Sequence, residues 1–202
     1  VVELDTESAD FLVTEELLPS ERVHGVDLLS WNPDMAFPNN KPFIVAGNFP
    51  YNISSQILFQ VIDWRERVPE LVGMFQKEVA QRIAEGPGSR TYGILSVLLQ
   101  TYYDIEYLFT VDEDAFDPPP RVKSGVIRLL RNDMIDPGCS FLHLKRVVKG
   151  AFNQRRKTLR NALSSAGFAE EMIPKEFLKK RAEQLSPKEF HILAIALIPT
   201  SS

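Results

Sequence analysis

The feature that most constrains the fold is an uninterrupted apolar run at residues 43–47, which ends abruptly at Asn48 and Pro50. An apolar run without alternation is typical of a parallel strand that is covered on both faces. Further strand-like stretches occur at residues 1–4, 22–26, 71–75, 105–111 and 124–130. The spacing of apolar residues between them predicts helices at residues 8–18, 54–64, 78–84 and 92–101. This alternation predicts a doubly wound α/β sheet.

The chain changes character near residue 135. Asp136, Pro137 and Gly138 interrupt the pattern, and no strand-like alternation follows them. Helical stretches are expected near residues 141–152, 156–166, 175–180 and 187–197. A length of 202 residues exceeds one ordinary domain but is short for two. We therefore predict an α/β domain at residues 1–135 and a small all-α domain at residues 136–202.

The composition, with 44% hydrophobic and 25% charged residues, excludes a collagen-like or largely disordered chain. No apolar run approaches the roughly 18–20 residues that a membrane span needs, so we expect no membrane association. The N-terminus lacks the features of a secretory signal, and the single cysteine, Cys139, fits the reducing cytoplasm. The 3 histidines are scattered, so we predict no metal site. A start inside an apolar stretch, without methionine, suggests a piece of a longer chain.

The net charge of −4 hides a strong asymmetry along the chain. Residues 1–40 contain nine acidic residues and one basic residue, Arg22, whereas residues 141–169 contain seven basic residues and no acidic one. The seven are Lys145, Arg146, Lys149, Arg155, Arg156, Lys157 and Arg160. A charge run is usually a solvated helix face, but the absence of a balancing acid favours a surface that binds nucleic acid.

The loop after the apolar run carries residue types that suit chemistry on an adenine base. In open α/β sheets, ligands bind at the carboxyl ends of strands, where Asn48 is expected. An exocyclic adenine amine is a poor nucleophile, and the side-chain oxygen of Asn48 with a backbone carbonyl could accept its two N–H bonds. Pro50 stiffens the turn and would help its carbonyls face the site, and Tyr51 could stack on an extruded base. The alternative is an ordinary strand-end turn with an aromatic plug.

Six segments resemble, in order, those of the rRNA adenine N6,N6-dimethyltransferases, the KsgA family. They are GNFPYNIS at residues 47–54, QKEVAQR at 76–82, YGILSV at 92–97, FDPPPRVKS at 116–124, NQRRKTLRN at 153–161 and RAEQLSPKEF at 181–190. The segments span nearly the whole chain. The resemblance implies a Rossmann-like class I methyltransferase sheet followed by a small all-α domain that binds RNA.

The resemblance implies transfer of methyl groups from S-adenosylmethionine to N6 of two adjacent adenosines near the 3′ end of small-subunit (16S) rRNA. Glu3 matches the acid that binds the donor ribose, with Asp5 as a nearby competitor, and Asp27 matches the acid that reads the donor adenine. Asn48 would bridge donor and target. Phe116 matches an aromatic residue that holds the flipped base, and its alternative role is a hydrophobic plug. We expect a cytoplasmic monomer whose partner is the immature small ribosomal subunit.

The sequence departs from the family pattern at the donor site. The family's glycine-rich turn after its first strand has no counterpart here, because the sequence enters the pattern at the second strand. The resemblance therefore predicts an N-terminally incomplete sheet. Two alternatives stay open: a non-catalytic rRNA-binding assembly factor, and a large-subunit rRNA adenine methyltransferase of the erythromycin-resistance type. The NQRRKTLRN segment favours the small-subunit enzyme.

Overall fold

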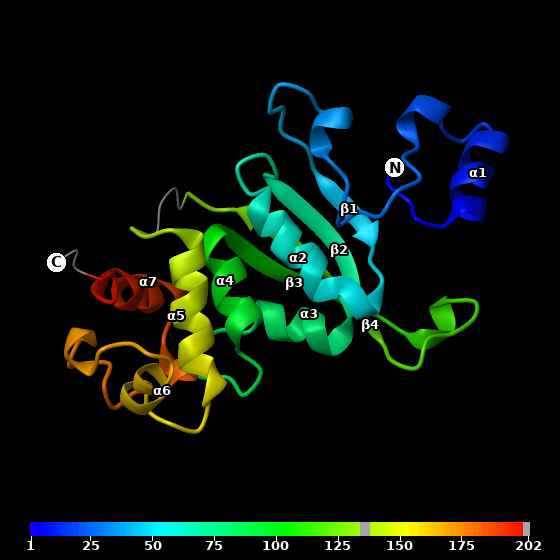
Figure 1. The fold of residues 1–202 in the computed structure, drawn as a ribbon. Coiled ribbons are helices and arrows are strands. Elements are labelled where there is room, and N and C mark those ends of the chain that lie inside the picture. The colour runs from blue at the N-terminus through cyan, green and yellow to red at the C-terminus, as the bar shows by residue number, and fades with distance from the viewer. Residues whose placement is uncertain (134–137, 200–202) are drawn as a thin grey trace.

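The structure, a computed structural model, describes residues 1–133 and 138–199. Its centre is a four-stranded sheet in the order β1-β2-β4-β3 (Figure 1). The strands are β1 (Val45–Asn48), β2 (Glu70–Gln76), β3 (Tyr103–Val111) and β4 (Ser124–Arg131). β1 and β2 are parallel, whereas β4 is antiparallel to both of its neighbours. The sheet is therefore mixed, since the connection between β3 and β4 contains no crossover helix that would bring β4 back parallel.

Three helices lie in front of the sheet in Figure 1. They are α2 (Ser54–Asp63), α3 (Lys77–Ala84) and α4 (Ile94–Tyr102). The strand side chains confirm which face is covered, because Leu71, Phe75 and Ile127 are fully buried while Val72 and Met74 are only half-buried. This alternation is the period of two that places successive side chains of a strand on opposite faces.

β1 is an edge strand of the described sheet, and this corrects the expectation that residues 43–47 are covered on both faces. Phe43 is buried, but Ile44 is 61% exposed and Ala46 is also exposed. Among the residues that the structure describes, β1 pairs only with β2, from Val45 opposite Leu71 onward. The apolar run is thus covered on the helix side alone.

The N-terminal segment, residues 1–40, contributes no strand to the described sheet. The strands expected at residues 1–4 and 22–26 are reduced to one parallel bridge between Val2 and His24. The expectation of a buried strand at residues 1–4 is wrong, since Val1 and Leu4 are exposed. The segment also contains α1 (Thr6–Thr14) and the 3₁₀ turns Ser20–Arg22 and Pro33–Met35.

The helical part, residues 138–199, contains three helices: α5 (Phe141–Asn153), α6 (Leu159–Ser165) and α7 (Pro187–Ala196). The helix expected near residues 175–180 is absent. A non-helical turn takes its place, between the 3₁₀ turns Glu170–Met172 and Ala182–Gln184. α5 and α7 pack on α4, so the helical part shares one core with the sheet. The predicted domain boundary at residues 135–136 lies outside the described residues. None of the helices in the described part of the chain has the length and apolar character of a membrane span.

Candidate active site

Asn48 ends β1 at the carboxyl end of the parallel pair β1–β2, and its side chain is exposed. The next side chain points the other way: the Phe49 ring is buried and stacks on Phe75, with ring centroids 5.1 Å apart. Gly73 makes room for this ring, because a Cβ atom there would lie 2.6 Å from the Cε2 atom of Phe49. Packing of Phe49 in the core therefore sets the direction in which Asn48 faces out.

The turn after Phe49 is closed by its own hydrogen bonds. The Pro50 carbonyl accepts from the Ile53 N–H at 3.3 Å and from the Ser54 hydroxyl at 3.2 Å. The Ser54 hydroxyl also lies 3.0 Å from the carbonyl of Tyr51. The Pro50 carbonyl is thus used inside the turn, whereas the sequence suggested that it would face the site. Pro50 holds the shape of the loop. The exposed carboxamide of Asn48 remains as a hydrogen-bond acceptor for a ligand.

Tyr51 is half-buried and is tied to the sheet through its hydroxyl group. The hydroxyl oxygen lies 2.6 Å from Oγ of Ser124, the fully buried first residue of β4. Phe116 is half-buried on the connection that leads from β3 into β4, directly after the 3₁₀ turn Glu113–Ala115. Sequence reasoning missed Ser124 as a partner of Tyr51, because the pair is joined only through the fold.

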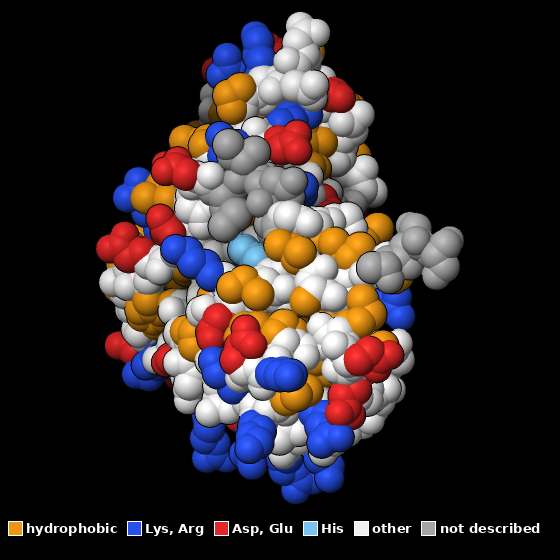
Figure 2. Space-filling view, turned by 90° about the vertical axis from the view of Figure 1, so that its left-hand side faces the viewer, with side chains coloured by type: hydrophobic (Ala, Val, Ile, Leu, Met, Phe, Trp, Pro, Cys, Tyr) orange, Lys and Arg blue, Asp and Glu red, His pale blue; other side chains and the backbone are white. Residues whose placement is uncertain are grey.

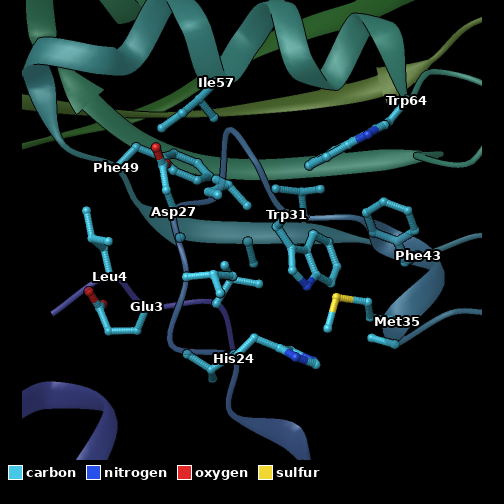
Figure 3. Close-up of a pocket in the computed structure, with 18 of the residues that line it drawn as sticks. Glu3, Leu4, His24, Asp27, Trp31, Met35, Phe43, Phe49, Ile57 and Trp64 are labelled. Atoms are coloured by element: carbon cyan, nitrogen blue, oxygen red, sulfur yellow. The ribbon is translucent and has the colours of Figure 1, made fainter. Parts of the chain in front are cut away.

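A cavity of about 1080 Å³ opens between the edge of β1, the start of α2 and the N-terminal segment (Figure 3). The three residues expected to bind the methyl donor, Glu3, Asp27 and Asn48, all line it. Figure 3 shows Glu3 and Asp27 toward one end and the aromatic side chains of Trp31 and Phe43 toward the other. The structure thus unites in one cavity three polar residues from separate stretches of sequence.

The structure separates Glu3 from its competitor Asp5. Asp5 caps α1, where its carboxylate accepts the Ser8 N–H at 2.8 Å, and this hydrogen bonding to Ser8 lowers the pKa of Asp5. Glu3 accepts the Asp5 N–H at 2.9 Å and Asp27 accepts the Leu29 N–H at 2.9 Å. Neither Glu3 nor Asp27 forms an ion pair with any described residue, so both carboxylates can accept hydroxyl or amine protons of a ligand.

Trp31 also lines the cavity, and sequence reasoning did not single it out. Its ring is buried and packs edge-on against Phe43 and Trp64. Its indole N–H is buried and has no hydrogen-bond partner within residues 1–133 and 138–199. A buried indole N–H normally finds a partner, so this donor is an unsatisfied group in the wall of the cavity. In the whole of the described chain, no His, Cys, Asp and Glu side chains gather in a group that could hold a metal ion.

Two of the seven basic residues expected to bind RNA form hydrogen bonds or an ion pair with other described residues. Arg155 is half-buried and donates to the carbonyls of Tyr92 at 2.8 Å and Ser89 at 3.4 Å. Arg160 forms an ion pair with Glu170 at 2.7 Å. Arg155 therefore ties the end of α5 to the loop before α4.

The other five basic residues have no ion-pair partner in the part of the chain that the structure describes. Arg156 and Lys157 are exposed in the turn between α5 and α6, because α6 begins at Leu159 rather than at residue 156 as expected. Lys145, Arg146 and Lys149 line a separate groove on α5. Figure 2 shows Lys and Arg side chains gathered along the lower edge of the helical end of the molecule.

Comparison with solved structures defines the fold. A dimethyladenosine transferase from Plasmodium falciparum matches with a TM-score of 0.76 and 22% identity, over 95% of this chain and 78% of that chain. The 23S rRNA methyltransferase ErmE matches with a TM-score of 0.68 and 21% identity, over 97% of this chain and 80% of that chain. These likenesses confirm the predicted Rossmann-like methyltransferase fold.

The chain belongs to the ribosomal RNA adenine dimethylase family, whose family model matches residues 1–198. Three curated relatives are each named ribosomal RNA small subunit methyltransferase A. The protein of Cytophaga hutchinsonii is 52% identical over 197 residues, 94% of this chain and 73% of that protein. The protein of Porphyromonas gingivalis is 51% identical over 200 residues, which are 98% of this chain and 77% of that protein. The protein of Flavobacterium johnsoniae is 48% identical over 193 residues, which are 96% of this chain and 74% of that protein. The family resemblance of the six segments is confirmed.

Proposed function

We propose that this chain transfers methyl groups from S-adenosylmethionine to N6 of two adjacent adenosines near the 3′ end of small-subunit rRNA, in the cytoplasm. The observation that carries the proposal is the meeting of Glu3, Asp27 and Asn48 in one cavity at the carboxyl end of β1. The names of the relatives support a small-subunit substrate over the large-subunit alternative.

The cavity fits the nucleoside half of the proposed donor. Its volume of about 1080 Å³ matches the upper range of small-molecule sites, which is roughly 1,000 Å³. Glu3 would accept the hydroxyl protons of a ribose, and Asp27 would accept the amine protons of the donor adenine. When bound, the donor supplies an electrophilic methyl group on a sulfonium.

Asn48 would act on the target amine. Its carboxamide oxygen accepts an N–H of the adenine amine, which draws the nitrogen lone pair out of the ring and toward the methyl group. Each transfer forms one N–C bond, breaks one S–C bond and releases one N–H proton. Tyr51, oriented by its hydrogen bond to Ser124, would stack on the extruded base together with Phe116.

The test is incorporation of labelled methyl groups into undermethylated small ribosomal subunits by the protein that contains this chain. Asn48→Ala should lower the rate at least about 100-fold, the usual effect of removing one aligned polar group at a reacting centre. Its affinity for the subunit should stay within a few-fold, because Asn48 contacts no phosphate in this scheme. Asn52→Ala, in the same loop but outside the cavity lining, is the matched control and should keep the rate.

A near wild-type rate for Asn48→Ala would refute the catalytic role. Subunit binding without methyl transfer by the unmodified protein would instead support the non-catalytic assembly factor. Calorimetry with S-adenosylmethionine separates these outcomes further, because a catalytic chain must bind the donor and an assembly factor need not.

A further inference from the structure

A second groove, of about 410 Å³, runs along α5 beside the turn that follows α6. Lys145, Arg146 and Lys149 line it from α5, while Ala166 and Phe168 line it from the turn. The helix and the turn approach closely because α5 carries a glycine there. A Cβ atom on Gly150 would lie 2.9 Å from Cβ of Ala166.

The groove is positively charged and has no internal counter-ion. Its lining contains three cationic side chains and no carboxylate. None of the three cations is ion-paired within residues 1–133 and 138–199. The Lys145 ammonium is held in place over the ring of Phe59 on α2, 4.4 Å from its centroid. A groove of this kind attracts an anion, and part of the groove's positive charge is held in a fixed position.

The groove also presents a flat surface. The Arg146 guanidinium carbon lies 4.9 Å from the centroid of the Phe168 ring, which is itself buried. His143 packs edge-on against the same ring, with centroids 6.4 Å apart, so the ring is supported. Arg146 is exposed, which leaves the outer face of its guanidinium open. A planar cation with one face open is a surface on which a nucleic-acid base can stack.

We propose that this groove binds one unpaired nucleotide of RNA, with its base stacked on Arg146 and its phosphate held by Lys149. Lys149 lies three residues after Arg146, so the two side chains are neighbours on the helix surface. The inference rests on the proposed function, since the nucleotide would belong to the rRNA substrate. α2 connects the two places, because its Phe59 lies under Lys145 and its Ile57 lines the donor cavity.

The proposal is tested by fluorescence anisotropy with two labelled probes: a single-stranded hexa-adenylate and an abasic ribose-phosphate hexamer of the same length. The unmodified protein should bind hexa-adenylate about tenfold more tightly or better, the effect of one stacked base. Arg146→Lys keeps the charge but removes the plane, so the preference for hexa-adenylate should fall about tenfold, and any preference that remains belongs to Tyr51 and Phe116. Lys149→Gln should lower the log–log salt slope by about 0.7 and keep the preference for bases.

Lys188→Gln is the control, because this exposed lysine at the start of α7 lies outside the groove lining. Thermal melts of all variants should coincide, which separates loss of binding from loss of folding. The proposal is overturned if the unmodified protein binds both hexamers equally or binds neither, or if Arg146→Lys leaves the preference for hexa-adenylate unchanged. It is also overturned if hexaglutamate competes as well as hexa-adenylate, which would indicate an acidic peptide.

The outcome is separable from that of the proposed function. Methyl transfer depends on Asn48, whereas the groove's share of the discrimination is the part that Arg146→Lys removes. If the methylation proposal fails, the hexamer preference of the groove is unaffected. If the groove proposal fails, Asn48→Ala should still lower the rate of methyl transfer at least about 100-fold.

Discussion

The N-terminal segment, residues 1–40, and the helical part, residues 138–199, join the same sheet by different means. In the helical part, the buried Phe190 stacks on Phe152 with ring centroids 5.8 Å apart, inside the core that includes the sheet. The N-terminal segment is held by the aromatic contacts of Trp31 and by the ion pair of Asp34 with Arg67 at 2.8 Å, while other apolar side chains such as Phe11 stay exposed. The helical part is integrated into the core, whereas the N-terminal segment packs against the core mainly through Trp31.

The difference matters because each part carries one of the two proposed binding sites. The donor cavity is walled by the N-terminal segment, so a donor that binds the ordered segment should also stabilise it. The basic groove lies on the core-bound helical part and should exist before RNA arrives. Four predictions test this contrast, beginning with the largest effect.

Phe190→Ala should destabilise the protein by about 3–5 kcal/mol, because it removes a fully buried ring from a packed core. Phe11→Ala, in the exposed face of α1, should change the free energy of unfolding by less than about 0.5 kcal/mol. Urea unfolding followed by circular dichroism measures both. Similar losses for the two variants would remove the contrast between the two parts.

Arg155→Gln should cost about 1.5–3 kcal/mol of stability, because the guanidinium donates two hydrogen bonds that join α5 to the loop before α4. Arg156→Gln changes the neighbouring exposed residue and should alter stability by less than about 0.5 kcal/mol. Arg156→Gln should instead lower the log–log salt slope of rRNA binding by roughly 0.7–0.9. Melting curves and salt titrations on both variants check the pair, and an unchanged slope for Arg156→Gln would argue against an RNA contact there.

Trp31→Ala should loosen the N-terminal segment alone. Trypsin cleavage after Arg22, the only basic residue in residues 1–40, should accelerate about tenfold, because local opening needs less free energy than global unfolding. The urea midpoint for unfolding of the sheet and the other helices should stay the same as in the unmodified protein. A fall in that midpoint comparable to that of Phe190→Ala would show that the segment belongs to the core.

His191 should make the seam between α4 and α7 sensitive to pH. Its ring lies 3.1 Å from the Thr101 hydroxyl, and burial lowers the pKa of His191 below its usual value. In the unfolded chain, His191 is protonated near pH 6.5, whereas in the folded protein it stays neutral to lower pH. The free energy of unfolding therefore falls as the pH drops below about 6.5. His191→Gln, which keeps a polar group beside Thr101, should flatten this dependence between pH 7.5 and 5.5. An unchanged pH profile of melting temperature would contradict the assignment.

Much of the local structure could be predicted because it depends on near neighbours in sequence. The strands β2 and β4 and the helices α2 and α3 lie within a few residues of their predicted bounds. The Asn48 loop was recognisable because its residue types suit one kind of chemistry. The helix expected at residues 175–180 failed, because apolar spacing there serves turns that are anchored by the buried Phe177.

The sequence by itself determined the family and the charge asymmetry and singled out the Asn48 loop, since these are properties of short segments. Only the tertiary structure decided which carboxylate lines the cavity, Glu3 rather than Asp5, and which arginine is tied down, Arg155 rather than Arg156. Neighbouring residues of the same type look alike in a sequence. They differ in the folded protein because burial and hydrogen-bond partners are supplied by segments far away along the chain.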